Sequence, residues 1–259
     1  MKHMNIEDYL VSEGIGTEVK IGFLDLLRGR LSEEKYLENE KLYEESHTHP
    51  SKTIKLVPKM YDFMAKHGVF TEFWQVNLGH MINNTQFITE NIAGQKRILD
   101  IGCADGLKTI YYALSFPGAH FVGIDRCTAA ISIAQKKAEK HSLGNICFVP
   151  ANLYHLGFKP ESFDSIIATQ VLHEDYAVYS TCHGLNQKYL FDKQIKSLSE
   201  ALAPKGKLLV TLLVNDIEQI RFEIEQAAVS AGLKPKQVSV KNYQNGKNMT
   251  TALNFVLQK

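Results

Sequence analysis

Paired cysteines are missing from this sequence. Its four cysteines stand at positions 103, 127, 147 and 182, and none belongs to a Cys-x-x-Cys pair. The chain also lacks any apolar run near the roughly 18 residues that a membrane-spanning helix requires, and it shows no signal peptide. We therefore expect reduced thiols, no membrane contact and a cytoplasmic location.

An excess of charge of either sign is missing too. The 259 residues include 29 basic and 28 acidic side chains, and the formal net charge is +1. Proteins that bind nucleic acid through its phosphates usually have a basic excess or stripe, so we expect no nucleic-acid partner. Clusters of metal ligands are missing as well: His47 and His49 have no further ligands beside them, and no metal site is expected.

The sequence changes character at about residue 95. Residues 1–94 show apolar stripes at helical spacing and no strand alternation. They predict helices separated by a loop at 47–51, a helix with Pro58 in its first turn, and a helix over 71–94 with a break at Gly79. We therefore divide the chain into a helical region, 1–94, and a core domain, 95–259.

Strand and helix patterns alternate in the core domain, which predicts crossover units and a parallel sheet with helices on both faces. Near the end, two strand-like runs are joined through Asn245-Gly246, which is typical of an antiparallel hairpin. The expected strands are 98–101, 121–125, 146–149, 163–169, 207–214, 237–243 and 251–257, and the expected helices are 107–116, 128–141, 186–202 and 216–231. Within the second of these helices, Lys136 and Lys137 are expected on the solvent-exposed face.

One stretch of the core domain has the composition of a ligand-binding turn. An apolar run with an acid near its end, 97–101, is followed by three small residues, Gly102, Ala104 and Gly106, and then by a helical pattern. Small residues let the backbone come close to a ligand, and the first N–H groups of a helix have no partner within the helix. The stretch therefore predicts a site for a nucleoside cofactor.

Polar side chains follow the next three strands. Asp125 ends the second strand, 19 residues after Gly106, where an acid reaches the ribose hydroxyls of a bound nucleoside. Asn152 and Leu153 follow the third strand, where an amide can hydrogen-bond adenine and an apolar side chain can cover its ring. Gln170 follows the fourth strand. All are expected at the carboxyl edge of the sheet, where doubly wound folds bind ligands.

The spacing of the turn distinguishes between cofactors. A dinucleotide turn needs Gly-x-Gly-x-x-Gly, whose second and third glycines would fall on Ala104 and Leu107. Gly-x-Ala-x-Gly favours a ligand without a pyrophosphate. Together with Asp100 before the turn and the late hairpin, this pattern resembles the class I S-adenosylmethionine-dependent methyltransferases over roughly 95–258.

Five segments carry the resemblance, and two positions depart from it. Leu99 to Gly106 is similar to the family's first motif, with Ala104 in place of a glycine. Asp125 matches the ribose-binding acid, and Asn152 stands where Asp is more frequent. The run Gln-Val-Leu-His-Glu at 170–174 and the strand entry at 205–210, preceded by Pro204, resemble two later motifs.

The resemblance implies an α/β fold with a Rossmann-like doubly wound sheet in the order 3-2-1-4-5-7-6, and S-adenosyl-L-methionine as the cofactor. Asp100 and Gly102 would hold the methionine end, Asp125 the ribose, and Gln170 would lie near the sulfonium. In many relatives an aromatic or polar residue of the helical region closes over the cofactor. The candidates here are Phe73, Trp74, Gln75 and His80, and we expect Trp74 to have this role. The implied cofactor contacts are Trp74, Asp100, Gly102, Cys103, Ala104, Gly106, Asp125, Arg126, Asn152, Leu153 and Gln170.

Methyl transfer from a sulfonium is an in-line displacement of an activated methyl group, so the protein mainly supplies position and excludes water. A base is needed only when the acceptor must lose a proton. The catalytic candidates are His173, Glu174 and His183, in the loop after the fourth strand. A structural role is the alternative for each histidine.

The expected reaction is transfer of the methyl group to an oxygen or nitrogen of a small-molecule acceptor. Two alternatives stay open: an enzyme of the same fold that uses the sulfonium cofactor for other chemistry such as cyclisation, and a non-catalytic cofactor-binding partner protein. The helical region is expected to cover the carboxyl edge as a lid. Its alternative is a dimerisation arm, which would make the protein a homodimer.

Overall fold

A computed structural model of the chain describes residues 4–16, 22–48, 50–153, 157–172, 187–213, 217–245 and 248–259. Its centre is a seven-stranded sheet in the order β3-β2-β1-β4-β5-β7-β6, which confirms the predicted fold class and strand order. The strands are β1 Arg97–Ile101, β2 His120–Asp125, β3 Ile146–Pro150, β4 Phe163–Thr169, β5 Leu202–Leu213, β6 Lys234–Asn245 and β7 Asn248–Gln258. The first five strands pair in parallel, and β7 pairs antiparallel with both β5 and β6.

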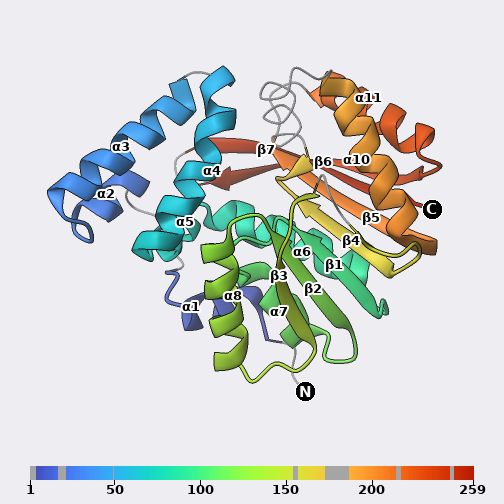
Figure 1. Cartoon of the computed structure of the whole chain (residues 1–259), viewed down its shortest axis with the longest axis horizontal. Helices are drawn as coiled ribbons and strands as arrows, with labels where there is room; N and C mark the ends of the chain where they lie inside the picture. Colours follow the sequence, from blue (N-terminus) through green and yellow to red (C-terminus); the bar gives the residue numbers. More distant parts are fainter. Residues whose placement is uncertain are drawn as a thin grey trace.

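Helices cover both faces of this sheet (Figure 1). Before the first strand lie α1 Ile6–Ser12, α2 Phe23–Arg28, α3 Glu33–Thr48, α4 Pro50–His67, α5 Phe70–Val76 and α6 Leu78–Ile92. Within the core domain lie α7 Leu107–Ser115, α8 Thr128–Lys140, α10 Gln187–Ala201 and α11 Ile217–Ser230. Among the described residues, no helix combines the length and the apolarity that are needed to cross a membrane.

Alternate side chains of β1 belong to two different hydrophobic cores, one on each face of the sheet. Ile98 packs with the helices that precede β1 and with α7 and α8, whereas Leu99 and Ile101 pack with α10 and α11. Because successive side chains of a strand point to opposite faces, Asp100 lies on the same face as Ile98. The first core joins residues of the helical region to residues of the core domain, and the boundary near residue 95 stays a prediction.

Three predictions in the helical region are wrong. The loop at 47–51 does not separate the helices, since α3 continues to Thr48 and α4 begins at Pro50. Pro58 therefore lies inside α4, and Pro50 is the proline at its start, where a missing N–H costs least. The later break lies at Asn77, between α5 and α6, and not at Gly79.

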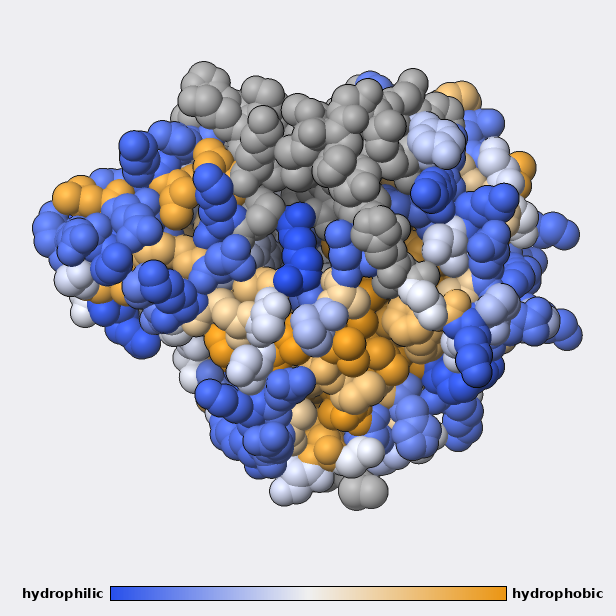
Figure 2. All heavy atoms as spheres, viewed as in Figure 1, coloured by the Kyte–Doolittle hydropathy of each residue, from blue (hydrophilic) through white to orange (hydrophobic). Residues whose placement is uncertain are grey.

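On the α10 side of the sheet, the described helices leave β2 and β3 largely uncovered (Figure 1). Figure 2 shows apolar side chains gathered over β2 and β3, beside the connection from β3 to β4. Val149 is 44% exposed there, and Cys147 is an exposed free thiol. On the adjacent strand β2, Val122 is paired in register with Cys147, and Ile124 is paired with Val149.

Candidate functional site

The turn after β1 has the conformation that its small residues predict. Gly102, Ala104 and Gly106 all have positive φ, at 68°, 49° and 76°. Glycine adopts this region readily, whereas alanine does so at a cost. The turn therefore concentrates three unusual backbone conformations in five residues, and Gly106 immediately precedes α7.

Packing also requires glycine at both ends of the turn. A Cβ on Gly102 would lie 2.7 Å from a methyl group of Val171, and one on Gly106 would lie 2.7 Å from Ala134 and from Phe148. Neighbouring side chains thus already contact these two backbone positions. The small residues were expected to let a ligand approach the backbone. At Gly102 and Gly106 it is side chains of the protein that approach it closely.

Asp125 connects the end of β2 to the turn. One carboxylate oxygen accepts the N–H of Ala104 at 2.9 Å, and the other accepts the N–H of Cys127 at 2.9 Å. Burial raises the pKa of Asp125, and these backbone donors oppose the rise. Since each carboxylate oxygen can accept a second hydrogen bond, Asp125 keeps acceptor capacity for the hydroxyls of a ribose.

Asp100 and Lys108 place opposite charges beside the turn. Asp100 is 3% exposed and accepts the Thr109 hydroxyl at 2.5 Å, and burial raises its pKa to about 6. Burial also lowers the pKa of Lys108, an effect that Asp100 and Asp105 oppose. A methionine end carries an ammonium and a carboxylate, so a buried acid and a partly buried base at the start of α7 suit that zwitterion.

Asp105 was not among the predicted site residues, yet it is fully buried within the turn. Its carboxylate accepts the indole N–H of Trp74 at 2.9 Å and forms an ion pair with Lys137. The expectation that Lys137 lies on a solvent-exposed helix face is therefore wrong, because a buried carboxylate two elements away binds it. Trp74 contacts the turn through this carboxylate, and its predicted contact with the cofactor stays a prediction.

The other predicted residues lie at the same edge in different environments. Gln170 has a positive φ of 57°, and its backbone and side-chain N–H groups both donate to the carbonyl of Thr211. Asn152 is exposed and Leu153 is buried, the latter within the core under α10 and α11. Cys103 is buried, which raises the pKa of its thiol well above the usual value.

Four predicted residues remain, one of them within the described part of the chain. Arg126 is exposed at the end of β2. The catalytic candidates His173, Glu174 and His183 lie outside the described residues. Among the residues that are described, no group of three or more His, Cys, Asp or Glu side chains has an arrangement that could hold a metal ion.

A second buried polar group lies at the first turn of α6. His80 Nδ1 lies 2.5 Å from the Tyr243 hydroxyl of β6, and the Asn84 amide lies 2.9 Å from His80 Nε2. Burial lowers the pKa of His80 to about 3 and raises that of Tyr243, so both side chains are neutral at pH 7. Tyr243 was not predicted from the sequence, because its partner His80 is 163 residues away in the chain.

We expect Tyr243→Phe to lower the free energy of unfolding by about 1–3 kcal/mol, because it leaves a buried imidazole nitrogen without its partner. Urea unfolding of the purified variant measures this loss. An unchanged unfolding midpoint would show that the contact between His80 and Tyr243 contributes nothing to stability.

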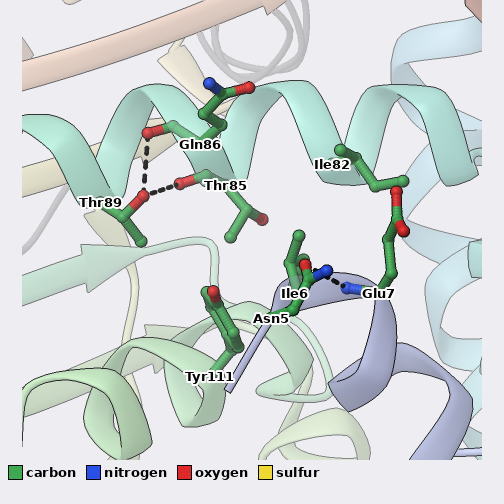
Figure 3. A pocket seen from close by; sticks show the side chains of 8 residues that line it. All are labelled: Asn5, Ile6, Glu7, Ile82, Thr85, Gln86, Thr89 and Tyr111. Atoms are coloured by element: carbon green, nitrogen blue, oxygen red, sulfur yellow. Dashed lines mark hydrogen bonds between the residues drawn. The ribbon is translucent and has the colours of Figure 1, made fainter. Parts of the chain in front are cut away.

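A pocket elsewhere on the surface is not this site. It lies between α1, α6 and α7 and has a volume of about 280 Å³ (Figure 3). None of its lining residues belongs to the turn or to a strand end. They are Asn5, Ile6, Glu7, Ile82, Thr85, Gln86, Thr89 and Tyr111.

Comparison with known proteins decides the family. A family model described as a methyltransferase domain matches residues 92–254, which include the turn, Asp125 and the hairpin strands. The chain belongs to this methyltransferase family. S-adenosylmethionine is the cofactor of these class I enzymes, which agrees with the prediction made from Gly-x-Ala-x-Gly and Asp125.

Individual relatives of this methyltransferase are distant. A phthiotriol/phenolphthiotriol dimycocerosates methyltransferase of Mycobacterium ulcerans is 26% identical over 51% of this chain and 43% of its own length. A malonyl-[acyl-carrier protein] O-methyltransferase of Legionella pneumophila is 35% identical over 36% of this chain and 32% of its own length. The chain thus spans less than half the length of either curated relative.

Solved structures show the same fold at low sequence identity. A SAM-dependent methyltransferase from Methanosarcina mazei has a TM-score of 0.51 and 19% identity, and the match covers 66% of this chain and 96% of that one. The [4+2]-cyclase SpnF has a TM-score of 0.55 and 16% identity, with 68% and 80% coverage. At such identities these likenesses establish the fold of this methyltransferase and not its substrate.

Proposed function

We propose that the protein transfers a methyl group from S-adenosylmethionine to an oxygen or nitrogen of a small-molecule acceptor, in the cytoplasm. The observation that carries this proposal is the placement of Asp100, Lys108 and Asp125 around a turn of positive φ. These side chains complement the ammonium, the carboxylate and the ribose of one cofactor molecule. One curated relative supports oxygen as the acceptor atom, since the Legionella protein is named as a malonyl-[acyl-carrier protein] O-methyltransferase.

The protein's own residues would act by position. Asp100 and Lys108 would orient the methionine end, and Asp125 would hold the ribose through its remaining lone pairs. Gln170 would lie near the sulfonium, at the end of β4. An in-line displacement from an activated methyl group needs little more than this alignment and the exclusion of water. A base is required only for an acceptor that must lose a proton.

Titration of the purified protein with S-adenosylhomocysteine tests cofactor binding. Trp74 is the only tryptophan of the chain, and its indole N–H contacts the turn. We therefore expect its fluorescence to change saturably as the ligand binds, with calorimetry giving the same dissociation constant. Absence of binding in both measurements would refute the proposed function.

Mass spectrometry of the products separates methyl transfer from its alternatives. Incubation with S-adenosylmethionine and a mixture of small hydroxy and amino compounds should yield a product heavier by one CH₂ together with S-adenosylhomocysteine. An isomerised product with an intact cofactor would favour cyclisation, the activity for which SpnF is named. Cofactor binding with no product from any compound would favour the non-catalytic partner protein.

A further inference from the structure

Asp105 is held from two sides by elements that are not part of the turn. Trp74 of α5 donates to one carboxylate oxygen at 2.9 Å, and Lys137 of α8 forms an ion pair with the other. The carboxylate is fully buried, so no water replaces either partner. An ionised group in such a place is tolerated only while its hydrogen bonds and its counter-charge remain in position.

The neighbours of Asp105 need this support. Ala104 before it has φ 49° and Gly106 after it has φ 76°. A left-handed conformation costs a residue with a side chain about 1–2 kcal/mol, so the turn persists because the surroundings fix it. Fixing the Asp105 side chain fixes the peptide units on both sides of it, and Asp125 adds a bond to the N–H of Ala104.

The helical region also contacts α7 immediately after the turn. The Tyr9 hydroxyl of α1 donates to the carbonyl of Leu107 at 2.9 Å, in the first turn of α7. Tyr9 and Trp74 both precede residue 92, where the match to the methyltransferase domain begins. The cofactor turn is thus supported by a part of the chain that the family domain does not include.

We infer that Asp105 is a positioning residue through which α5 and α8 hold the turn in its cofactor-binding conformation, so that the helical region sets the affinity for the cofactor. This inference rests on the proposed function, because it requires that the cofactor binds at this turn. The Asp105 carboxylate contacts Trp74 and Lys137, and its effect on the cofactor is indirect.

Removing one partner should weaken cofactor binding. If the turn is correctly folded only part of the time, the apparent dissociation constant rises in inverse proportion to that fraction. We expect Trp74→Phe, which keeps an aromatic ring but removes the N–H, to weaken S-adenosylhomocysteine binding ~10-fold in calorimetry. Lys137→Met removes the other partner of the same carboxylate, the ammonium from α8, and should weaken binding by a similar factor.

A matched control separates this role from general loss of α5 stability. Phe70 stacks on Trp74 with ring centroids 6.4 Å apart and is 4% exposed, and no hydrogen bond joins it to the turn. Phe70→Leu should lower the melting temperature while leaving the dissociation constant within about twofold. Equal losses of affinity in Phe70→Leu and Trp74→Phe, at equal losses of stability, would overturn the inference.

Rescue provides the second test, and it holds even if Trp74→Phe fails to fold. Adding Asp105→Asn to Lys137→Met removes the unpaired buried charge, and the amide oxygen can still accept the Trp74 N–H. We expect the double variant to bind S-adenosylhomocysteine more tightly than Lys137→Met alone. No recovery, with binding intact in the unaltered protein, would overturn the positioning role, whereas no binding in the unaltered protein would refute the proposed function.

Discussion

Asp100→Asn is expected to stabilise the cofactor-free protein and to weaken its binding of S-adenosylhomocysteine by about tenfold or more. Burial raises the pKa of this carboxyl from 3.8 to about 6, so its ionised form at pH 7 costs about 3 kcal/mol relative to the unfolded chain. The variant removes that cost. Under the proposed function, it also removes the charge that would face the ammonium of the cofactor.

The direction of the pH dependence follows from the raised pKa. The folded protein holds this proton more tightly than the unfolded chain does, so the contribution of Asp100 to stability is largest below pH 4 and declines as the pH rises through 6. Under the proposed function, cofactor binding should have the opposite dependence, because an ammonium placed beside Asp100 would favour its ionised form. Below pH 6 the affinity should fall by up to about tenfold per pH unit, with release of a proton on binding.

Calorimetry between pH 5 and 7, in two buffers of different ionisation enthalpy, measures both the affinity and the number of protons released on binding. The other groups around the turn are Lys108, Asp125 and Asp105, with His80 and Tyr243 neutral nearby. Asp100→Asn is the control: its affinity should be nearly independent of pH over this range. The same pH dependence in the variant would assign the proton to another group, with Asp125 the first to examine because burial raises its pKa too.

The parts of the site that the sequence predicts are those that follow strands. A strand ends, and the next few residues must lie at the carboxyl edge; Asp125 and Gln170 were therefore placed correctly from their order in the chain alone. The turn was predicted because positive φ selects glycine. Ala104 was the departure, and the structure shows it at φ 49° with its N–H bonded to Asp125.

Partners that are distant in sequence could not be predicted in this way. Lys137 has the local pattern of an exposed helix residue, and only the packing of α8 beside the turn brings it to Asp105. Tyr243 and His80 meet because β6 runs parallel to β5 and ends at the same edge as the first turn of α6. Such contacts depend on how helices pack against the sheet, which periodicity along one helix does not encode.

Boundaries in the helical region were predicted less well for a related reason. Two prolines, at 50 and 58, compete as the start of α4, and local preference for proline in the first turn fits both. In the structure α4 begins at Pro50 and continues through Pro58. Met60, Phe63 and Met64 of α4 are buried in the core, and such packing offsets the local cost of an internal proline.

Gly106→Ala should produce the largest loss of stability among single methyl additions at the turn, about 3 kcal/mol, and should abolish detectable binding of S-adenosylhomocysteine. A left-handed alanine costs about 1–2 kcal/mol, and overpacking of a core costs about 1–3 kcal/mol more. Both apply here, since φ is 76° and the added Cβ would lie 2.7 Å from Ala134 and Phe148. Neither neighbour is free to move, because Ala134 of α8 and Phe148 of β3 are both buried in the core.

Two further variants separate conformation from packing. Gly144 has open space around it, and Gly144→Ala should change the free energy of unfolding by less than about 0.5 kcal/mol. Gly102→Ala meets a methyl group of Val171 at 2.7 Å, so adding Val171→Ala should recover the packing part of the loss and leave the conformational part. If Gly106→Ala unfolds at the same urea concentration as the unaltered protein, the turn does not have the positive φ on which the cofactor site depends, and the site would have to lie elsewhere along the edge.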